Sequence, residues 1–296
     1  MTTKTAMITG TNSGFGRATA ELFLSKGWNV VATQRTVPDK LPFDAPERVR
    51  MVALELNDPK SIEAAAAAAL SAFGRIDVLV NNAGYFQMGP LETTTMEQFR
   101  AQFETNVFGL VGLTKALLPA MRKAGGGVII NLSSLSAENG YPFAAAYASS
   151  KAAVLVLTEA LNLELDAINV SVKAILPGIH ATGIFGKIET VDLIPEPYRP
   201  LLSRFMKLQR ASGGSSPTGV AELIYEAATD GKRDVVRYFA GKDATGVPMM
   251  KRLLGQAGYF RFFRNTVLNG PGRVVRWMTP SLPEKVTITP KLDSWD

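Results

Sequence analysis

Cysteine is absent from this 296-residue sequence, and histidine occurs once, at His180. Without cysteine the chain has no disulfide, cysteine nucleophile or thiolate metal site. A single histidine also excludes a histidine-rich zinc site, and a Ser-His-Asp hydrolase would have to depend wholly on His180. These absences remove several common classes of enzyme, and we expect no metal at the functional site.

Long apolar runs are also missing: no stretch approaches the roughly 18 residues of a membrane-spanning helix. The N-terminus lacks a basic segment followed by an apolar stretch and a cleavage site, so we expect no signal peptide and a cytoplasmic protein. Apolar residues make up 46% of the chain, which is enough for a substantial core. The net charge of +6 comes entirely from residues 230–296, which carry 12 basic and 6 acidic residues.

Apolar, strand-like runs alternate with helical patterns through the first 240 residues. This alternation predicts a doubly wound, Rossmann-type α/β domain over residues 1–240, with a parallel sheet of about seven strands and helices on both faces. The expected strands are residues 5–9, 29–33, 49–54, 76–81, 128–132, 170–176 and 235–240. The expected helices are residues 14–26, 61–73, 96–123, 145–168 and 217–230.

Two regions do not follow this alternation of strands and helices. Residues 184–216 contain Pro195, Pro197 and Pro200, and we expect a long loop that acts as a substrate lid. Residues 241–296 form a C-terminal extension with a basic-aromatic stretch at 259–264. We expect this extension to pack on the domain or cover the cleft rather than lie on a membrane. No recognition motif accompanies its charge, so we expect no nucleic-acid partner.

A glycine-rich turn follows the first expected strand and opens the first expected helix. The segment from Thr9 to Gly16 places Gly10, Gly14 and Gly16 in a strand–turn–helix context. Glycines there let the backbone turn sharply and approach a pyrophosphate, which the positive end of the helix attracts. The turn therefore predicts a dinucleotide site.

Six motifs follow one another in an order that resembles the short-chain dehydrogenase/reductase (SDR) family over residues 4–240. They are the glycine turn, Asn81-Asn82-Ala83-Gly84, Asn106, Ser134, Tyr147-x-x-x-Lys151 and Pro177-Gly178-x-x-x-Thr182. The resemblance implies an oxidoreductase that moves a hydride between a nicotinamide and an alcohol or carbonyl carbon (EC 1.1.1 type). The long lid and the extension are most similar in style to hydroxysteroid and retinol dehydrogenase members.

The second strand indicates which nicotinamide is used. An acidic residue at its end favours NAD, whereas a cation suits the 2′-phosphate of NADP. Gln34 stands where an acid would favour NAD, and Arg35 follows it. We expect NADP(H), with NAD(H) not excluded. The resemblance implies a cofactor site of Gly10, Asn12, Ser13, Gly14, Phe15, Gly16, Arg35, Glu55, Leu56, Asn82, Ala83, Gly84, Tyr147, Lys151, Pro177, Gly178, Ile179 and Thr182.

Tyr147 and Lys151 are four residues apart in a helical pattern, so their side chains share one helix face. A free tyrosine has a pKa of about 10, and a nearby ammonium stabilises the phenolate, so that tyrosine can act as a general base near neutral pH. Ser134 follows a buried strand and can hold a substrate oxygen. Ser133 competes for this role, but the family interval to the tyrosine selects Ser134.

The resemblance implies further roles around this pair. Lys151 would also bind the nicotinamide ribose, and the Asn106 backbone would hold a water that links Lys151 to solvent. The other interpretation of Asn106 is a helix kink or a satisfied core amide. His180 is expected to be an ordinary loop residue rather than a substrate contact. The expected substrate pocket comprises Ser134, Leu135, Tyr141, Phe143 and Phe185.

Two functions from different classes stay open at this point. The first is an active NADP(H)-dependent carbonyl reductase or alcohol dehydrogenase with a small, lipophilic substrate and Tyr147 as general acid and base. The alternative is a catalytically silent NADP(H)-binding sensor or scaffold with the same fold. By resemblance, a homodimer would form through the helices at 96–123 and 145–168.

Overall fold

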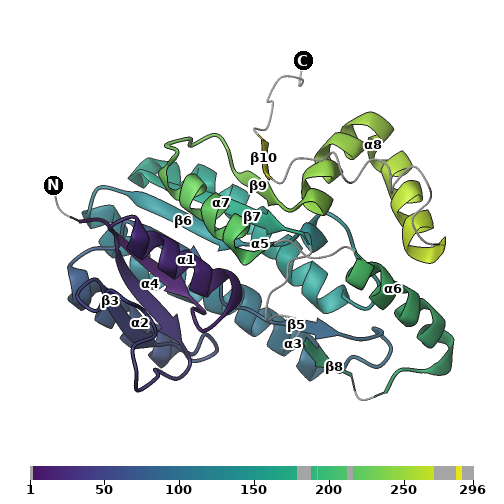
Figure 1. The fold of residues 1–296 in the computed structure, drawn as a ribbon, viewed down its shortest axis with the longest axis horizontal. Helices are drawn as coiled ribbons and strands as arrows, with labels where there is room; N and C mark the ends of the chain where they lie inside the picture. Colours follow the sequence, from purple (N-terminus) through teal and green to yellow (C-terminus); the bar gives the residue numbers. More distant parts are fainter. Residues whose placement is uncertain (1–2, 179–187, 192, 212–215, 270–284, 289–296) are drawn as a thin grey trace.

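An eight-stranded sheet forms the centre of the computed structural model, which describes residues 3–178, 188–191, 193–211, 216–269 and 285–288 (Figure 1). The strand order is β10-β9-β7-β6-β4-β1-β2-β3. Seven of these strands pair in parallel with their neighbours. Among the described strands only β10, the last in the chain, pairs antiparallel. Their bounds are β1 (Thr5–Thr9), β2 (Asn29–Gln34), β3 (Val49–Ala53), β4 (Val78–Asn81), β6 (Gly127–Leu132), β7 (Val170–Pro177), β9 (Arg237–Ala240) and β10 (Lys285–Ile288).

The central strands are mostly apolar because both of their faces are covered. Every residue of β1 and of β7 is buried, as expected for parallel strands between two helical layers. The expected doubly wound parallel sheet of about seven strands is therefore confirmed. The antiparallel edge strand β10 was not expected, since it lies in the Gly- and Pro-rich tail.

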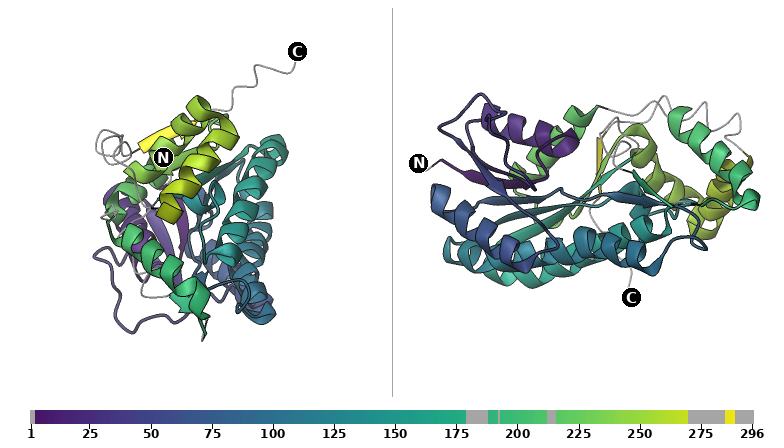
Figure 2. Two further views of the ribbon diagram at one scale, coloured as in Figure 1. Left: turned by 90° about the vertical axis from the view of Figure 1, so that its right-hand side faces the viewer. Right: turned by 90° about the horizontal axis from the view of Figure 1, so that it is seen from below.

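Helices cover the two faces of the sheet (Figure 2). On one face, α1 (Gly14–Ser25) and α7 (Pro217–Thr229) bury side chains such as Phe23 and Leu223 in one core cluster. On the other, α2 (Pro59–Phe73) and α4 (Leu110–Lys123) bury Ile62 and Leu117. The helix α5 (Ala145–Glu164) packs on β7 and is followed by the 3₁₀ turn η3 (Leu165–Ile168).

The single helix expected over residues 96–123 is instead built in three parts. α3 (Met96–Phe103) leads into a π-helical segment, η1 (Glu104–Gly109), and α4 follows. Asn106 lies within η1, where its side chain bonds the backbone of Tyr85 rather than its own helix. The π-helical turn thus coincides with a polar side chain that faces inward. Such turns are frequently found at functional sites.

The expected lid also contains regular structure. In residues 188–211, β8 (Ile188–Thr190) pairs in parallel with β5 (Phe86–Met88), and a 3₁₀ turn, η5 (Glu196–Tyr198), precedes α6 (Arg199–Ala211). In the extension, α8 (Lys242–Asn269) is bent at Gly255, where φ is 65°. α6 and α8 contact each other beyond one end of the sheet (Figures 1 and 2).

Candidate active site

The carboxyl ends of the parallel strands bring the sequence motifs to one edge of the sheet. The glycine turn follows β1, Asn82 follows β4, Ser134 lies just past β6, and Pro177 ends β7. The chain leaves β1 toward β2 on one side and returns to β4 on the other, so a topological switch point lies between β1 and β4. Ligands of doubly wound sheets bind outside the strand ends at such a point.

The glycine turn is closely packed against β4. Gly10 and Gly14 have φ values of 72° and 58°, which other L-residues rarely adopt. A Cβ on Gly16 would overlap the carbonyl oxygen of Gly10, so only glycine lets α1 start this close to β1. The Asn82 amide donates to the carbonyl oxygen of Thr9 at 2.7 Å and braces the turn. The first turn of α1 contains no acidic residue, which leaves its positive end suited to a phosphate.

Two residues expected near the adenosine differ in how they are held. Arg35 directly follows β2 and is exposed, and it has no ion pair with the described residues. Glu55 is tied into its own turn, because its carboxylate accepts from the backbone N–H of Asn57 at 3.1 Å. Leu56 is buried and lies against η1, where a Cβ on Gly109 would be 2.7 Å from its carbonyl oxygen. The Arg35 side chain can therefore reorient toward a ligand more easily than the Glu55 side chain can.

Tyr147 and Ser134 meet at the edge of the sheet. Burial raises the pKa of Tyr147, and a hydrogen bond with the Ser134 hydroxyl opposes this effect. The Tyr147 ring also packs on Phe86, with 4.6 Å between the ring centroids. The neighbouring Ser133 is engaged elsewhere, since its hydroxyl donates to the backbone carbonyl of Lys151 at 2.9 Å. Of the two serines, Ser134 is the one whose hydroxyl contacts the phenol.

Lys151 lies one helical turn beyond Tyr147, and its Nζ is 5.8 Å from the centroid of the Tyr147 ring. Its ammonium donates to the carbonyl oxygen of Leu132, at the end of β6, at 2.7 Å. The side chain is buried, and burial lowers its pKa from 10.5 to about 8. Lys151 is thus adjacent to the phenol, as the spacing predicts, but in this structure its hydrogen bond goes to the strand and its ribose contact stays a prediction.

The Asn106 side chain is almost fully buried and has three protein partners. Its oxygen accepts from the Tyr85 N–H at 3.2 Å, and its nitrogen donates to the Tyr85 carbonyl and to the Ser150 hydroxyl. A Cβ on Gly84 would lie 2.8 Å from the Asn106 oxygen. This amide therefore joins the β4–β5 connection to α5. The water relay through its backbone stays a prediction.

The residues expected to line the substrate pocket are largely aromatic. Tyr141 and Phe143 pack against Phe205 of α6, with ring centroids 6.0 and 6.4 Å apart, and Leu135 is buried. Phe143 has a φ of 65°, an unusual value for a bulky residue that is often found where structure is held for function. Four residues named from the sequence, Ile179, His180, Thr182 and Phe185, lie outside the described residues.

Two contacts near the site were not expected from the sequence. Phe86 supports the Tyr147 ring, although the alternation after Gly84 could have suggested a strand there. Asp243, in the first turn of α8, lies so close to Gly178 that a Cβ on this glycine would overlap its carboxylate. The start of α8 therefore lies directly against Gly178, and no local sequence pattern predicts this contact.

A partly buried ion-pair network connects the segment after Ser134 to three other elements. Glu138 accepts from Arg237 of β9 and from Lys251 of α8, each at 2.5 Å. Arg237 also pairs with Glu159 of α5 at 2.5 Å. The carboxylate of Glu138 is only 12% exposed. The network thus connects the serine-bearing segment, the tyrosine-bearing helix and the C-terminal extension.

The described residues contain no cluster of His, Asp and Glu that could hold a metal ion. Within the same part of the chain, none of the helices combines the length and the apolar character needed to cross a membrane.

The parallel sheet, the glycine turn at its switch point and the Ser134–Tyr147–Lys151 group define an α/β oxidoreductase with a dinucleotide-type site. Residues 4–192 match the family described as short chain dehydrogenase. The chain therefore belongs to the short-chain dehydrogenase/reductase family, whose members use NAD(H) or NADP(H).

Comparisons with individual proteins agree with this assignment. The chain is 37% identical over 258 residues to the uncharacterized oxidoreductase YusZ of Bacillus subtilis, a match that covers 82% of this chain and 90% of YusZ. It is 40% identical over 177 residues to a 3-ketodihydrosphingosine reductase of Bacteroides thetaiotaomicron, covering 60% of this chain and 64% of that protein. A crystal structure of a short-chain dehydrogenase from Streptomyces avermitilis has a TM-score of 0.78 and 32% identity, covering 90% of this chain and 98% of its own.

Proposed function

We propose that this oxidoreductase uses NADP(H) to interconvert a carbonyl and an alcohol on a small, lipophilic substrate, with Tyr147 as general acid and base. The observation that carries the proposal is the contact of the Ser134 hydroxyl with the Tyr147 phenol, beside the buried ammonium of Lys151. These groups lie at the sheet edge that also holds the glycine turn. A substrate oxygen placed between the two hydroxyls would have a donor and an acid within reach.

In the direction of reduction, the Ser134 hydroxyl holds the carbonyl oxygen and the Tyr147 phenol gives it a proton. The bound nicotinamide supplies the hydride to the carbonyl carbon. In the reverse direction the Tyr147 phenolate accepts the alcohol proton, and the raised pKa of Tyr147 opposes formation of this phenolate. A positive charge close to the phenol offsets this, because it stabilises the phenolate. Lys151, 5.8 Å from the ring centroid, is the positive group that this chain provides.

Arg35 supports NADP(H) as the cofactor. It is exposed directly after β2, and neither Gln34 nor Arg35 is an acid that would bind a ribose 2′-hydroxyl. A guanidinium suits a phosphate because it can donate two parallel hydrogen bonds. We propose that Arg35 binds the 2′-phosphate.

The substrate class is proposed from the aromatic side of the site. Tyr141, Phe143 and Phe205 pack together with the apolar face of α6, which includes Leu201 and Leu202. Such a wall favours a lipophilic ketone, aldehyde or secondary alcohol, like the substrates of the hydroxysteroid and retinol dehydrogenases that the chain resembles. The relative named 3-ketodihydrosphingosine reductase acts, by its name, on a ketone and is consistent with this class.

The activity can be tested by NADPH oxidation at 340 nm against a panel of lipophilic ketones and aldehydes. We expect turnover in the wild type and its loss in Tyr147→Phe, while the affinity for NADPH stays nearly unchanged. Turnover that survives in Tyr147→Phe would remove this residue from its role. Tight NADPH binding without turnover of any substrate would instead favour a sensor or scaffold.

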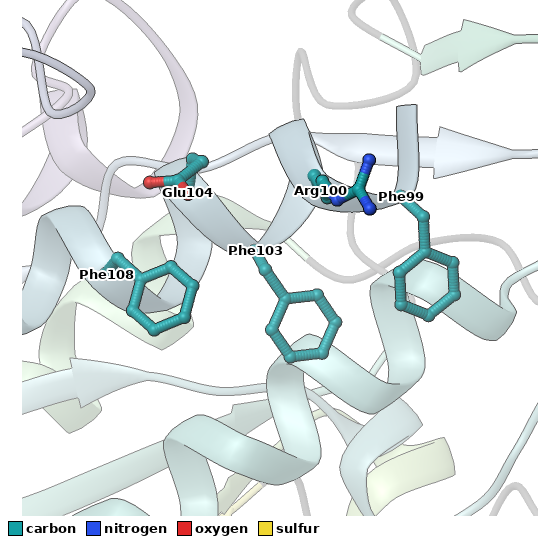
Figure 3. Close-up of a pocket in the computed structure, with 5 residues that line it drawn as sticks. All are labelled: Phe99, Arg100, Phe103, Glu104 and Phe108. Carbon is teal, nitrogen blue, oxygen red and sulfur yellow. The ribbon is translucent and has the colours of Figure 1, made fainter. Parts of the chain in front are cut away.

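We also propose that the protein forms a homodimer through α3, η1, α4 and α5. Figure 3 shows a pocket on α3 and η1 that is lined by Phe99, Arg100, Phe103, Glu104 and Phe108. Phe99 and Phe103 stack with 5.6 Å between their centroids. Phe108, Val156 and Leu163 are exposed on η1 and α5. Aromatic side chains beside one arginine are typical of protein interfaces.

A further inference from the structure

The C-terminal extension has a long stretch without negative charge. Residues 244–283 contain no aspartate or glutamate, while they carry the basic residues Lys251, Arg252, Arg261, Arg264, Arg273 and Arg276. Four of these six belong to α8. A local excess of one sign attracts partners of the other, so the partner of this segment is expected to be anionic.

α8 has an inner and an outer face. Its inner face is buried against the domain through Val247 and Tyr259, and Phe263 packs on Tyr141 with 5.2 Å between the ring centroids. Its outer face exposes large apolar side chains: Met249 is 45% exposed, Leu253 69%, Leu254 48% and Phe260 60%. Leu253 and Leu254 immediately precede Gly255, where α8 bends, and the bent helix is visible in Figure 1.

Basic side chains accompany these apolar ones. Lys251 is on the inner side and pairs with Glu138. Arg252, Arg261 and Arg264 are exposed, and within the described part of the chain none of the three forms an ion pair. Arg252 adjoins Leu253, and Arg261 adjoins Phe260. We call this set the α8 outer surface: Met249, Arg252, Leu253, Leu254, Phe260, Arg261 and Arg264.

We propose that the α8 outer surface binds the surface of membranes that contain anionic lipids. Arginines beside single protruding leucine and phenylalanine side chains are suited to a layer where charged headgroups overlie acyl chains. A nucleic acid would satisfy the arginines but not the exposed leucines. An acidic protein would need a complementary apolar pocket for a helix corner. The attachment is peripheral. The sequence predicts only that this segment packs on the domain, and the inner face of α8 does so. The outer face would make the contact with the membrane.

The inference does not depend on the proposed activity, and it is tested without a substrate. The purified full chain is sedimented with phosphatidylcholine vesicles, with or without 30% phosphatidylglycerol, at low and at high salt. We expect binding only to the anionic vesicles, and weaker binding at high salt because the charges are exposed. Binding to neither kind of vesicle, or equal binding to both, would overturn the proposal.

Variants of α8 test whether this helix carries the binding to vesicles. Each arginine near an anionic surface contributes about fivefold in affinity. Arg252→Gln/Arg261→Gln/Arg264→Gln should therefore weaken binding by roughly a hundredfold. The same three positions changed to lysine should keep most of it. Leu253→Ser/Leu254→Ser should weaken binding by about tenfold or more, because leucine insertion is lost.

Matched controls change the same residue types elsewhere. Lys60→Gln/Arg122→Gln/Lys123→Gln removes three exposed charges from α2 and α4, and Leu91→Ser removes an exposed leucine. These controls should bind vesicles as the wild type does, and a loss equal to that of the α8 variants would refute the assignment. Light scattering after size exclusion gives the oligomeric state of every variant. If the α8 variants alter oligomeric state while vesicle binding is unchanged, the surface is a contact between copies of the chain and the proposal is wrong.

Discussion

Replacing Lys151 with methionine should stabilise the cofactor-free protein while it removes activity. The Lys151 ammonium is buried, and the Leu132 carbonyl is its hydrogen-bond partner among the described residues. Burial lowers its pKa from 10.5 to about 8, which means that the folded protein holds this charge less readily than the unfolded chain does. Methionine has a similar length and no charge, so it removes the cost of desolvation with little change in packing.

The size of the effect follows from the two pKa values. A difference between 10.5 and about 8 corresponds to about 3 kcal/mol of lost stability when both states are protonated, which holds below pH 8. Above pH 10.5 both states are neutral and the cost disappears, and at pH 9.5 about 1 kcal/mol remains. Methionine leaves the Leu132 carbonyl without its donor, which costs about 1–2 kcal/mol. The variant should therefore gain about 1–2 kcal/mol at pH 7 and nothing, or a small loss, at pH 9.5.

The assay is urea denaturation of wild type and variant at pH 7 and pH 9.5, without cofactor. The matched control is Lys173→Met, because Lys173 is equally buried but pairs with Asp230 at 2.5 Å. Removing Lys173 leaves the buried carboxylate of Asp230 without its counter-ion, so this variant should lose about 3–5 kcal/mol. The reasoning fails if Lys151→Met unfolds at a lower urea concentration than the wild type at pH 7, or if its gain is the same at both pH values.

Three further outcomes are expected. Gly16→Ala should lose most of its NADPH affinity, because the new Cβ would overlap the Gly10 carbonyl and push α1 away; calorimetric titration that finds normal affinity would contradict this. Arg35→Ala should weaken NADPH binding by about tenfold or more relative to NADH, and an unchanged ratio of the two affinities would defeat the NADP(H) assignment. Phe108→Asp should shift the protein from dimer to monomer in light scattering, and a dimer that persists would place the interface elsewhere.

The sheet and the order of the motifs could be predicted because their signals are local. Strands buried on both faces are mostly apolar, and every residue of β1 and β7 is buried, although β7 includes Ser171 and Lys173. The positions of Ser134 and Tyr147 followed from their intervals, and the fold brings these two side chains into contact. What could not be predicted was the direction of the Lys151 ammonium, since the carbonyl that it meets belongs to a strand 19 residues away.

Prolines misled the interpretation of residues 184–216. They argued for a long loop, yet Pro200 is the second residue of α6. Proline is tolerated in the first turn of a helix, because its missing N–H has no partner there in any case. The apolar spacing of Leu201, Leu202 and Phe205 was visible beyond it. In the same way Pro248 and Gly255 concealed α8, which bends at the glycine and continues.

The parts that resisted prediction are those that would select a substrate. The phenol, the serine and the glycine turn are held by the sheet, whose pattern is short-range and shared with the family. The proposed wall of the substrate pocket consists of Tyr141, Phe205 of α6 and Phe263 of α8, and the last two lie 64 and 122 residues beyond Tyr141 in the chain. Neither aromatic contact follows from a local rule, because each depends on how α6 and α8 settle against the domain. Exchanging side chains on α6 and α8 should therefore change substrate preference while the Ser134–Tyr147 contact stays in place.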